Sequence, residues 1–163
     1  MVNIKTHHIV ANVLTIGFLL TIGSLAQPNE ETTNGSISDK DLECLVSNIY
    51  HEARGESPWG MVAVGYVTMN RAKYHHKSVC DVVWEPHQFS WTSDGRPDTM
   101  DDVMSIKKSV DIALLVAKGK VRNPIGNALN YYAHNKVKPY WANNAKEYII
   151  VDNHTFLTLG KGN

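Results

Sequence analysis

The residues best suited to chemistry lie close together, in the stretch Asn-Ile-Tyr-His-Glu-Ala-Arg-Gly-Glu at residues 48–56. It contains two carboxylates, Glu52 and Glu56, together with His51 and Arg54. Charged side chains are rare on the buried side of a helix unless they are paired or functional. This stretch is therefore the first candidate for a functional site.

Glu52 is the candidate general acid. Apolar residues around it recur with helical spacing and predict one face of a helix: Leu42, Leu45, Val46, Ile49 and Ala53. At about 100° per residue, Glu52 lies about 20° from Leu45, at the margin of that face. Partial burial and the negative end of the helix dipole both raise the pKa of a carboxyl there. Such a carboxyl can protonate a glycosidic oxygen near neutral pH. The alternative is an exposed carboxylate paired with Arg54 or Lys40.

Three helices are expected to position this acid, each with an apolar face of helical period: residues 38–55, 57–71 and 98–119. Ser38 begins the first with a capping box, and Ser57 caps the second before a proline. The third begins at Asp98 or Thr99. Short strands follow at residues 129–133, 148–151 and 154–158, the last two joined by a turn at residues 152–153. The fold class is therefore α+β, with a mainly helical lobe and a small antiparallel β element flanking a groove.

Length and charge limit the possible functions. The 163 residues suit a single domain, expected over residues 37–163. Lys plus Arg and Asp plus Glu number 16 each, so no basic field is available to hold a nucleic acid. We expect no nucleic-acid partner and a monomeric protein.

The first 36 residues are expected to direct export. Lys5 precedes an apolar run at residues 9–25, and Ser-Leu-Ala at residues 24–26 matches a signal peptidase site. Residues 1–26 are therefore a signal peptide or, if uncleaved, a signal anchor, which would be the only contact with the membrane. Residues 27–36 hold no apolar side chain and form a polar linker. The expected location is the periplasm, cell wall or extracellular space.

The expected export bears on the redox state of the two cysteines. Cys44 and Cys80 are the only pair, and an oxidising compartment favours a disulfide between them. Closing this loop would stabilise the fold by roughly 3–4 kcal/mol in the chain-entropy model. The alternative is two small buried hydrophobic residues.

Residues 88–91, Gln-Phe-Ser-Trp, form an expected extended segment that runs into a turn at residues 94–97. Aromatic rings beside amide and hydroxyl groups suit carbohydrate, because sugars have apolar ring faces and many hydroxyls. Phe89 is better interpreted as core packing, and Trp91 suits either role.

Six motifs in this order carry a family resemblance: CLVSNIYHEARGE (44–56), VTMNR (67–71), VCDVV (79–83), QFSW (88–91), ALNYYAH (128–134) and NHTF (153–156). Together they resemble the SleB/CwlJ-like cell wall hydrolase family over residues 42–157. The resemblance implies a lysozyme-like fold, peptidoglycan glycan strands as substrate, and lytic transglycosylase chemistry without a cofactor. Glu52 matches the family's catalytic glutamate.

By this resemblance, protonated Glu52 donates to the oxygen between N-acetylmuramic acid and N-acetylglucosamine. As a carboxylate it then accepts the proton of the muramyl C6 hydroxyl, which closes onto C1. A hydrolytic muramidase is the alternative, and it would use a second carboxylate at about 5 Å or about 6.5–9.5 Å. The candidates for that group are Glu56, Asp94 and Asp98.

Six residues are expected to bind substrate: Glu56, Gln88, Ser90, Trp91, Tyr132 and His134. Glu56 has two alternatives, a bond to its own loop or an exposed position. Arg54, Asn70 and Arg71 are interpreted as structural.

Two other functions remain as alternatives. A zinc amidase or peptidase would cut the stem peptides, but Gly55 stands where the motif His-Glu-x-x-His needs its second histidine. His51, His134 and His154 would have to converge in space, and no metal is expected. A wall-binding module without catalysis is the other alternative. Cell separation, wall remodelling, germination and phage lysis all remain open as settings.

Overall fold

The computed structural model describes residues 37–136 and 138–159. The expected signal segment and linker, residues 1–36, lie outside the described residues. The described elements are α1 (Asp39–Ala53), α2 (Pro58–His75), α3 (Val79–Val83), η1 (Ser90–Ser93), α4 (Val103–Ala117), β1 (Asn130–Ala133), η2 (Tyr140–Asn144), β2 (Ala145–Val151) and β3 (His154–Leu159), where η denotes a 3-10 helix. None of the helices within these ranges is long and apolar enough to cross a membrane.

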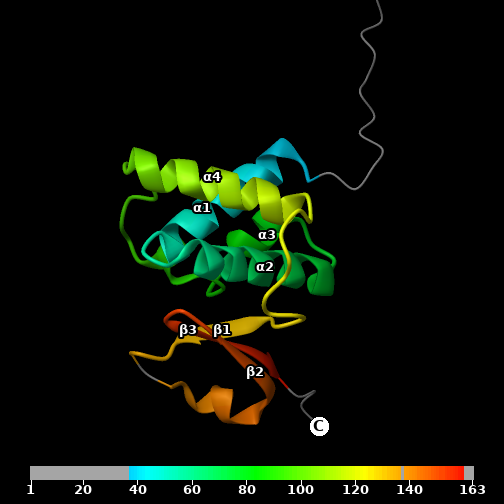
Figure 1. Ribbon diagram of the computed structural model, residues 1–163. Helices are drawn as coiled ribbons and strands as arrows, with labels where there is room; N and C mark the ends of the chain where they lie inside the picture. Colours follow the sequence, from blue (N-terminus) through cyan, green and yellow to red (C-terminus); the bar gives the residue numbers. More distant parts are fainter. Residues whose placement is uncertain (1–36, 137, 160–163) are drawn as a thin grey trace, which may run out of the picture. The chain divides into compact units, whose positions relative to one another are not determined.

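The helices form one lobe (Figure 1), in which α1 packs against α2, α3 and α4. The core includes the apolar face predicted for α1 and apolar residues of α2, α3 and α4, and it extends to Val151 and Phe156 of the sheet. Gly65 allows α2 to approach its neighbours closely, because a Cβ at this position would lie 3.1 Å from Ile49 and 3.3 Å from Val116. The close packing of α1 holds its last turn, which carries Glu52, in a fixed position.

Side-chain caps explain where the helices begin. The Ser38 hydroxyl accepts a bond from the Asp41 backbone N–H, and the Ser57 hydroxyl accepts bonds at the start of α2, as predicted. The prediction for the third long helix was wrong by several residues. Asp102 caps it by accepting from two backbone N–H groups, while the Tyr50 hydroxyl accepts from the N–H of Asp101 and holds the preceding segment outside the helix.

Three further differences concern short or terminal segments. α2 extends to His75, beyond the predicted end at residue 71, and α3 was not predicted. Residues 90–93 form the 3-10 helix η1 where an extended segment was expected. The physical reason is that the Thr92 hydroxyl and backbone N–H both bond to the Phe89 carbonyl, which closes a tight turn.

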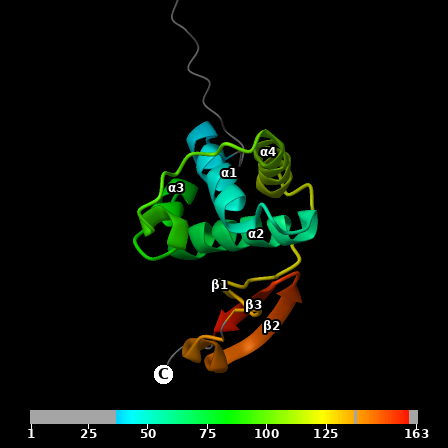
Figure 2. The same ribbon diagram turned by 90° about the vertical axis from the view of Figure 1, so that its left-hand side faces the viewer.

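The strands form one antiparallel sheet in the order β1-β3-β2. β3 is the central strand, and the sheet lies below α2 in Figure 2. The predicted turn at residues 152–153 joins β2 to β3. Asp152 fixes this turn to the helical lobe, because its Oδ2 accepts bonds from the backbone N–H and hydroxyl of Ser57, at 3.0 Å and 2.6 Å.

Cys44 and Cys80 form the expected disulfide, which links α1 to α3 and closes a loop of 36 residues in sequence separation. We expect the double variant Cys44→Ser/Cys80→Ser to lose roughly 3–4 kcal/mol of unfolding free energy, because the unfolded chain regains loop entropy. Urea unfolding with and without reductant measures this. Reductant should lower the stability of the wild type alone. An equal response of both proteins would contradict the stabilising role.

Candidate active site

Glu52 lies in a pocket of about 450 Å³ where helices and sheet meet. The lining residues come from α1, α2, η1 with the segment before it, and β1: Glu52, Arg71, His87, Gln88, Phe89, Ser90, Ser93 and Tyr131. Among these described lining residues, Glu52 is the only carboxylic acid. Acid–base chemistry in this pocket therefore centres on Glu52.

Tyr131 is the direct partner of this carboxyl. Its hydroxyl donates a hydrogen bond to Oε2 of Glu52, with 2.7 Å between the oxygens. The ring of Tyr131 stacks on Phe156, its partner across the β1-β3 pair, which holds the phenol in place. Because one oxygen of Glu52 is occupied, Oε1 is the oxygen free to carry a transferable proton.

Burial raises the pKa of Glu52 above its usual value of 4.5. The hydrogen bond from Tyr131 and the positive charges of Arg71 and Lys136 act in the opposite direction, because they stabilise the carboxylate. The net direction is upward, as expected from the position of Glu52 on the helix. Burial also raises the pKa of Tyr131, so its phenol stays protonated and remains a donor.

Arg71 supports the pocket from α2. Its Nε donates to the Leu129 carbonyl at 2.7 Å, and its Nη1 donates to the Gln88 carbonyl at 3.2 Å. The guanidinium also lies over the Phe89 ring, 4.9 Å from the centroid. Arg71 thus joins the pocket's helical wall to the residue before β1, which agrees with the structural role expected for it.

The structure brings only two of the six expected substrate-binding residues to Glu52. Gln88 and Ser90 line its pocket. Tyr132 follows Tyr131 on β1 and therefore faces the opposite side of the sheet, where it contacts Trp141 edge-on. His134 is exposed beyond the end of β1, with Nδ1 3.2 Å from the Thr155 hydroxyl.

Trp91 is a core residue with 7% of its surface exposed. Its indole N–H donates to Oδ1 of Asn48 at 2.9 Å, and the His51 ring stacks on it at 4.3 Å between centroids. Its faces are therefore occupied by protein. Of the two roles expected for Trp91, the geometry favours packing.

Glu56 points toward the turn between β2 and β3. Its carboxylate accepts bonds from the side-chain amide of Asn153 at 3.3 Å and lies 3.8 Å from Nδ1 of His154. Burial lowers the pKa of His154, and the nearby Glu56 opposes that change. Glu56 thus bonds a neighbouring loop and is not among the residues that line the Glu52 pocket.

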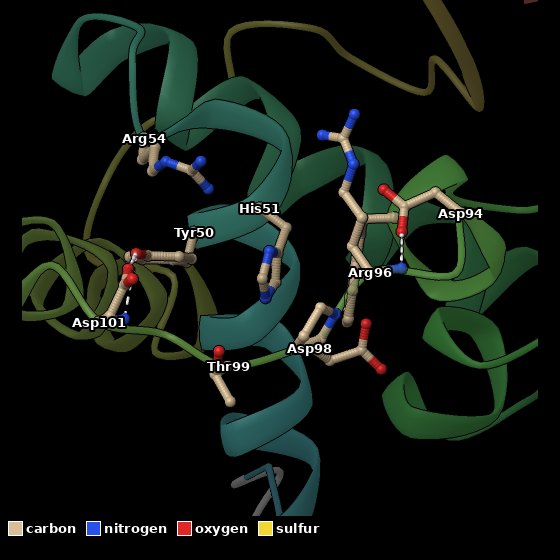
Figure 3. A pocket seen from close by; sticks show the side chains of 10 residues that line it. Tyr50, His51, Arg54, Asp94, Arg96, Asp98, Thr99 and Asp101 are labelled. Carbon is tan, nitrogen blue, oxygen red and sulfur yellow. Dashed lines mark hydrogen bonds between the residues drawn. The ribbon is translucent and has the colours of Figure 1, made fainter.

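A second pocket, also of about 450 Å³, borders the same last turn of α1 (Figure 3). Its lining residues are Tyr50, His51, Arg54, Trp91, Asp94, Arg96, Pro97, Asp98, Thr99 and Asp101. Asp94 and Asp98, two candidates for a second catalytic carboxylate, lie here. Neither they nor Glu56 line the Glu52 pocket.

No group of three or more His, Cys, Asp or Glu side chains within residues 37–136 and 138–159 is arranged to hold a metal ion. His51 lies in the second pocket, stacked on Trp91, while His134 and His154 lie at the sheet. His51 thus lies in a different part of the described structure from the other two histidines that a zinc site would need.

Tyr131 was missed by sequence reasoning, although it lies within a recognised motif. The alternation of β1 shows that Tyr131 and Tyr132 face opposite sides. No signal in the sequence separates the two tyrosines, because the pairing of Tyr131 with Phe156 across β1 and β3 is a property of the tertiary structure.

Comparison with known proteins identifies the family of this chain. A sequence model of the family described as Cell Wall Hydrolase matches residues 55–157, more than half of the chain. The chain belongs to the cell wall hydrolase family. The family is one of enzymes, and the resemblance noted from the motifs is thereby confirmed.

Family relatives and solved structures support the same assignment. The spore cortex-lytic enzyme of Bacillus cereus is 28% identical over 127 residues, which cover 73% of this chain and 47% of that protein. The chain thus spans about half the length of this curated relative. The catalytic domain of the Bacillus cereus SleB protein matches with a TM-score of 0.59 at 24% identity, covering 81% of this chain and all of that one.

The catalytic domain of the germination-specific lytic transglycosylase SleB from Bacillus anthracis matches with a TM-score of 0.60 at 26% identity. This match covers 77% of the present chain and 99% of that domain. The helical lobe with its three-stranded antiparallel sheet is therefore the lysozyme-like fold of SleB catalytic domains, as predicted.

Proposed function

We propose that this cell wall hydrolase cleaves peptidoglycan between N-acetylmuramic acid and N-acetylglucosamine as a lytic transglycosylase. The observation that carries the proposal is the Glu52 pocket, where one carboxyl of raised pKa is bonded to Tyr131 and no other carboxylic acid is among the described lining residues. A single group that serves first as acid and then as base suits transglycosylation.

In the first step, Glu52 carries its proton on Oε1 and donates it to the glycosidic oxygen. The bond between that oxygen and muramyl C1 breaks, and the N-acetylglucosamine portion leaves with the proton. Positive charge develops on the muramyl ring while Glu52 becomes a carboxylate. The Tyr131 hydroxyl, already donating to Oε2 at 2.7 Å, stabilises this new negative charge.

In the second step, the Glu52 carboxylate accepts the proton of the muramyl C6 hydroxyl as O6 bonds to C1. The product is a 1,6-anhydromuramyl end, and Glu52 is again protonated. Water does not enter the balance. The hydrolytic alternative needs a second carboxylate near the bond, and Glu56, Asp94 and Asp98 are placed in other surroundings.

Gln88 and Ser90 are proposed to bind the glycan in this pocket, because their amide and hydroxyl groups line it beside Glu52. The proposed partner is the glycan strand alone, without a cofactor. Export is part of the proposal, because the substrate lies outside the cytoplasm, with residues 1–26 as the signal segment and residues 37–163 as the catalytic domain.

The proposal is tested by incubating purified peptidoglycan with the protein. Soluble glycan fragments should appear, and EDTA should not affect their release. Release of free stem peptides that EDTA abolishes would identify a metal-dependent amidase. Binding to peptidoglycan without any release would identify a wall-binding module.

Tyr131→Phe should move the alkaline limb of the pH–activity profile to higher pH. Activity requires protonated Glu52 and falls as pH rises through its pKa. The Tyr131 bond lowers that pKa, so its removal raises the pKa further. Rates of fragment release across pH measure the shift.

The matched control for this variant is Tyr66→Phe. Tyr66 also donates its hydroxyl to a protein oxygen, the Val121 carbonyl at 2.6 Å, but it lines neither pocket. Its pH profile should keep the wild-type position. An unshifted alkaline limb in Tyr131→Phe would show that the Tyr131 bond does not act on the titrating acid.

A further inference from the structure

The second pocket shares its walls with the Glu52 pocket. On α1, Glu52 lines one pocket and its neighbour His51 lines the other. At η1, Ser93 lines the Glu52 pocket and the next residue, Asp94, lines the second. The two pockets therefore border the same two segments of the chain, the last turn of α1 and the end of η1.

Both basic and acidic side chains line the second pocket. The guanidinium groups of Arg54 and Arg96 lie on either side of His51, with the Asp94 carboxylate beside Arg96, and the Asp98 carboxylate lies on the side of the pocket away from both guanidinium groups (Figure 3). The side chains of Arg54, Arg96 and Asp98 are exposed, and none forms one of the salt bridges found among the described residues. These groups are available to a ligand that carries both carboxylate and ammonium groups.

Other interactions give this pocket a defined shape. The Tyr50 hydroxyl donates to Oδ1 of Asp101 at 3.1 Å, which fastens the pocket's far wall to α1. Oδ1 of Asp94 accepts from the backbone N–H of Arg96 at 2.9 Å and fixes the turn between them. Two of the three acids are thus held by protein donors, while Asp98 has no such bond among the described residues.

A sugar ring is poorly matched to this pocket. Sugars bind to exposed aromatic faces, but Trp91 is buried and His51 covers its face. The Tyr50 ring is buried as well, with the Arg54 guanidinium over it at 4.9 Å from the centroid. The lining presents mainly charged and hydroxyl groups, which suit a peptide.

We propose that this pocket binds the stem peptide of the substrate strand. The inference rests on the proposed function, because muramic acid carries its peptide on the lactyl group, next to the bond that Glu52 would cleave. Arg54 and Arg96 bind the peptide's carboxylates, and Asp98 binds the amino group of its diamino acid. The enzyme therefore prefers glycan strands that carry stem peptides.

The test compares two substrates, peptide-bearing glycan strands and the same strands stripped of peptides by an amidase. For the full chain, kcat/KM on peptide-bearing strands should exceed that on stripped strands by about tenfold, the value of one good charge-assisted contact. In Arg54→Ala/Arg96→Ala this ratio should fall to near one. The control Arg122→Ala changes an exposed arginine outside both pockets and should keep the wild-type ratio.

Two results would overturn the proposal. An equal loss on both substrates would assign the pocket to the glycan, and an unchanged ratio would show that it contacts no part of the strand. Circular dichroism of the double variant establishes that it is folded, and titration with a free stem peptide gives a second measurement that does not depend on cleavage.

The free-peptide titration also separates this proposal from the proposed function. Binding that Arg54→Ala/Arg96→Ala weakens about tenfold, in a protein that releases no glycan fragments, would retain the peptide site and reject the transglycosylase. Fragment release without peptide binding or substrate preference would retain the transglycosylase and reject the peptide site.

Discussion

Glu52→Gln should reduce the release of glycan fragments by roughly 10²–10⁴-fold, the usual contribution of a general acid–base group. Glutamine keeps the shape of the side chain and can still accept the Tyr131 hydrogen bond, but it has no proton to donate and cannot accept one from the C6 hydroxyl. The rate of fragment release from purified peptidoglycan is the measurement.

The matched control is Glu43→Gln, which changes an exposed glutamate on the same helix, outside both pockets. It should release fragments at the wild-type rate. If Glu52→Gln also did so, Glu52 would not be the proton-transfer group. The raised pKa of Glu52 and its place in the pocket would then need another explanation.

The same substitution should make the protein more stable at neutral pH. Below the usual pKa of 4.5, Glu52 is protonated in both the folded and the unfolded chain. As pH rises, the unfolded chain ionises first, so wild-type stability falls through the interval up to the raised folded pKa. The Glu52→Gln variant does not undergo this loss. Its free energy of unfolding, measured with urea, should therefore exceed that of the wild type above pH 4.5 but not below it.

Arg71→Met should lower the free energy of unfolding by about 3 kcal/mol, because it leaves the carbonyls of Leu129 and Gln88 without their donor. Methionine retains much of the apolar volume of the side chain, so the loss reports mainly on the guanidinium. Urea unfolding measures it. Fragment release should also fall, because both carbonyls belong to segments that form the pocket.

Arg122→Met is the control for this variant, since Arg122 is exposed and lines neither pocket. Its unfolding free energy should stay within about 0.5 kcal/mol of the wild type. Equal stability of the two variants would contradict the bridging role of Arg71 between α2 and the residue before β1.

The position of Glu52 was predictable because it depends on local helical geometry. The spacing of Leu45 and Ile49 defines the apolar face, and the carboxyl at its margin is half-buried with a raised pKa. The caps at Ser38 and Ser57 are equally local, because each side chain bonds within three residues of itself. Local patterns of this kind can be read without knowing the fold.

Features that depend on distant partners could not be predicted in this way. Trp91 is bonded to Asn48, 43 residues away, and Glu56 is bonded to Asn153, 97 residues away. For both residues the sequence left open whether the side chain binds substrate or another part of the protein. The choice between Tyr131 and Tyr132 likewise depends on which face of the sheet meets the helices, a tertiary property that alternation leaves open.

The start of α4 shows how three local capping signals can compete. Asp98, Thr99 and Asp102 are all residue types that cap helices. Tyr50 decides among them, because its hydroxyl accepts from the N–H groups of Asp101 and Asp102 and fixes the chain there. The helix therefore begins after Asp102, and the residues before it form the wall of the second pocket.

Mass spectrometry of the muropeptides that the protein releases from purified peptidoglycan tests the central claim most directly. Transfer of the bond to the C6 hydroxyl, with Glu52 as acid and then base, predicts 1,6-anhydromuramyl ends, lighter than ordinary ends by one water. Reducing muramic acid ends would contradict transglycosylation and show a hydrolytic muramidase. Free stem peptides with uncut glycan would contradict cleavage of the glycosidic bond altogether.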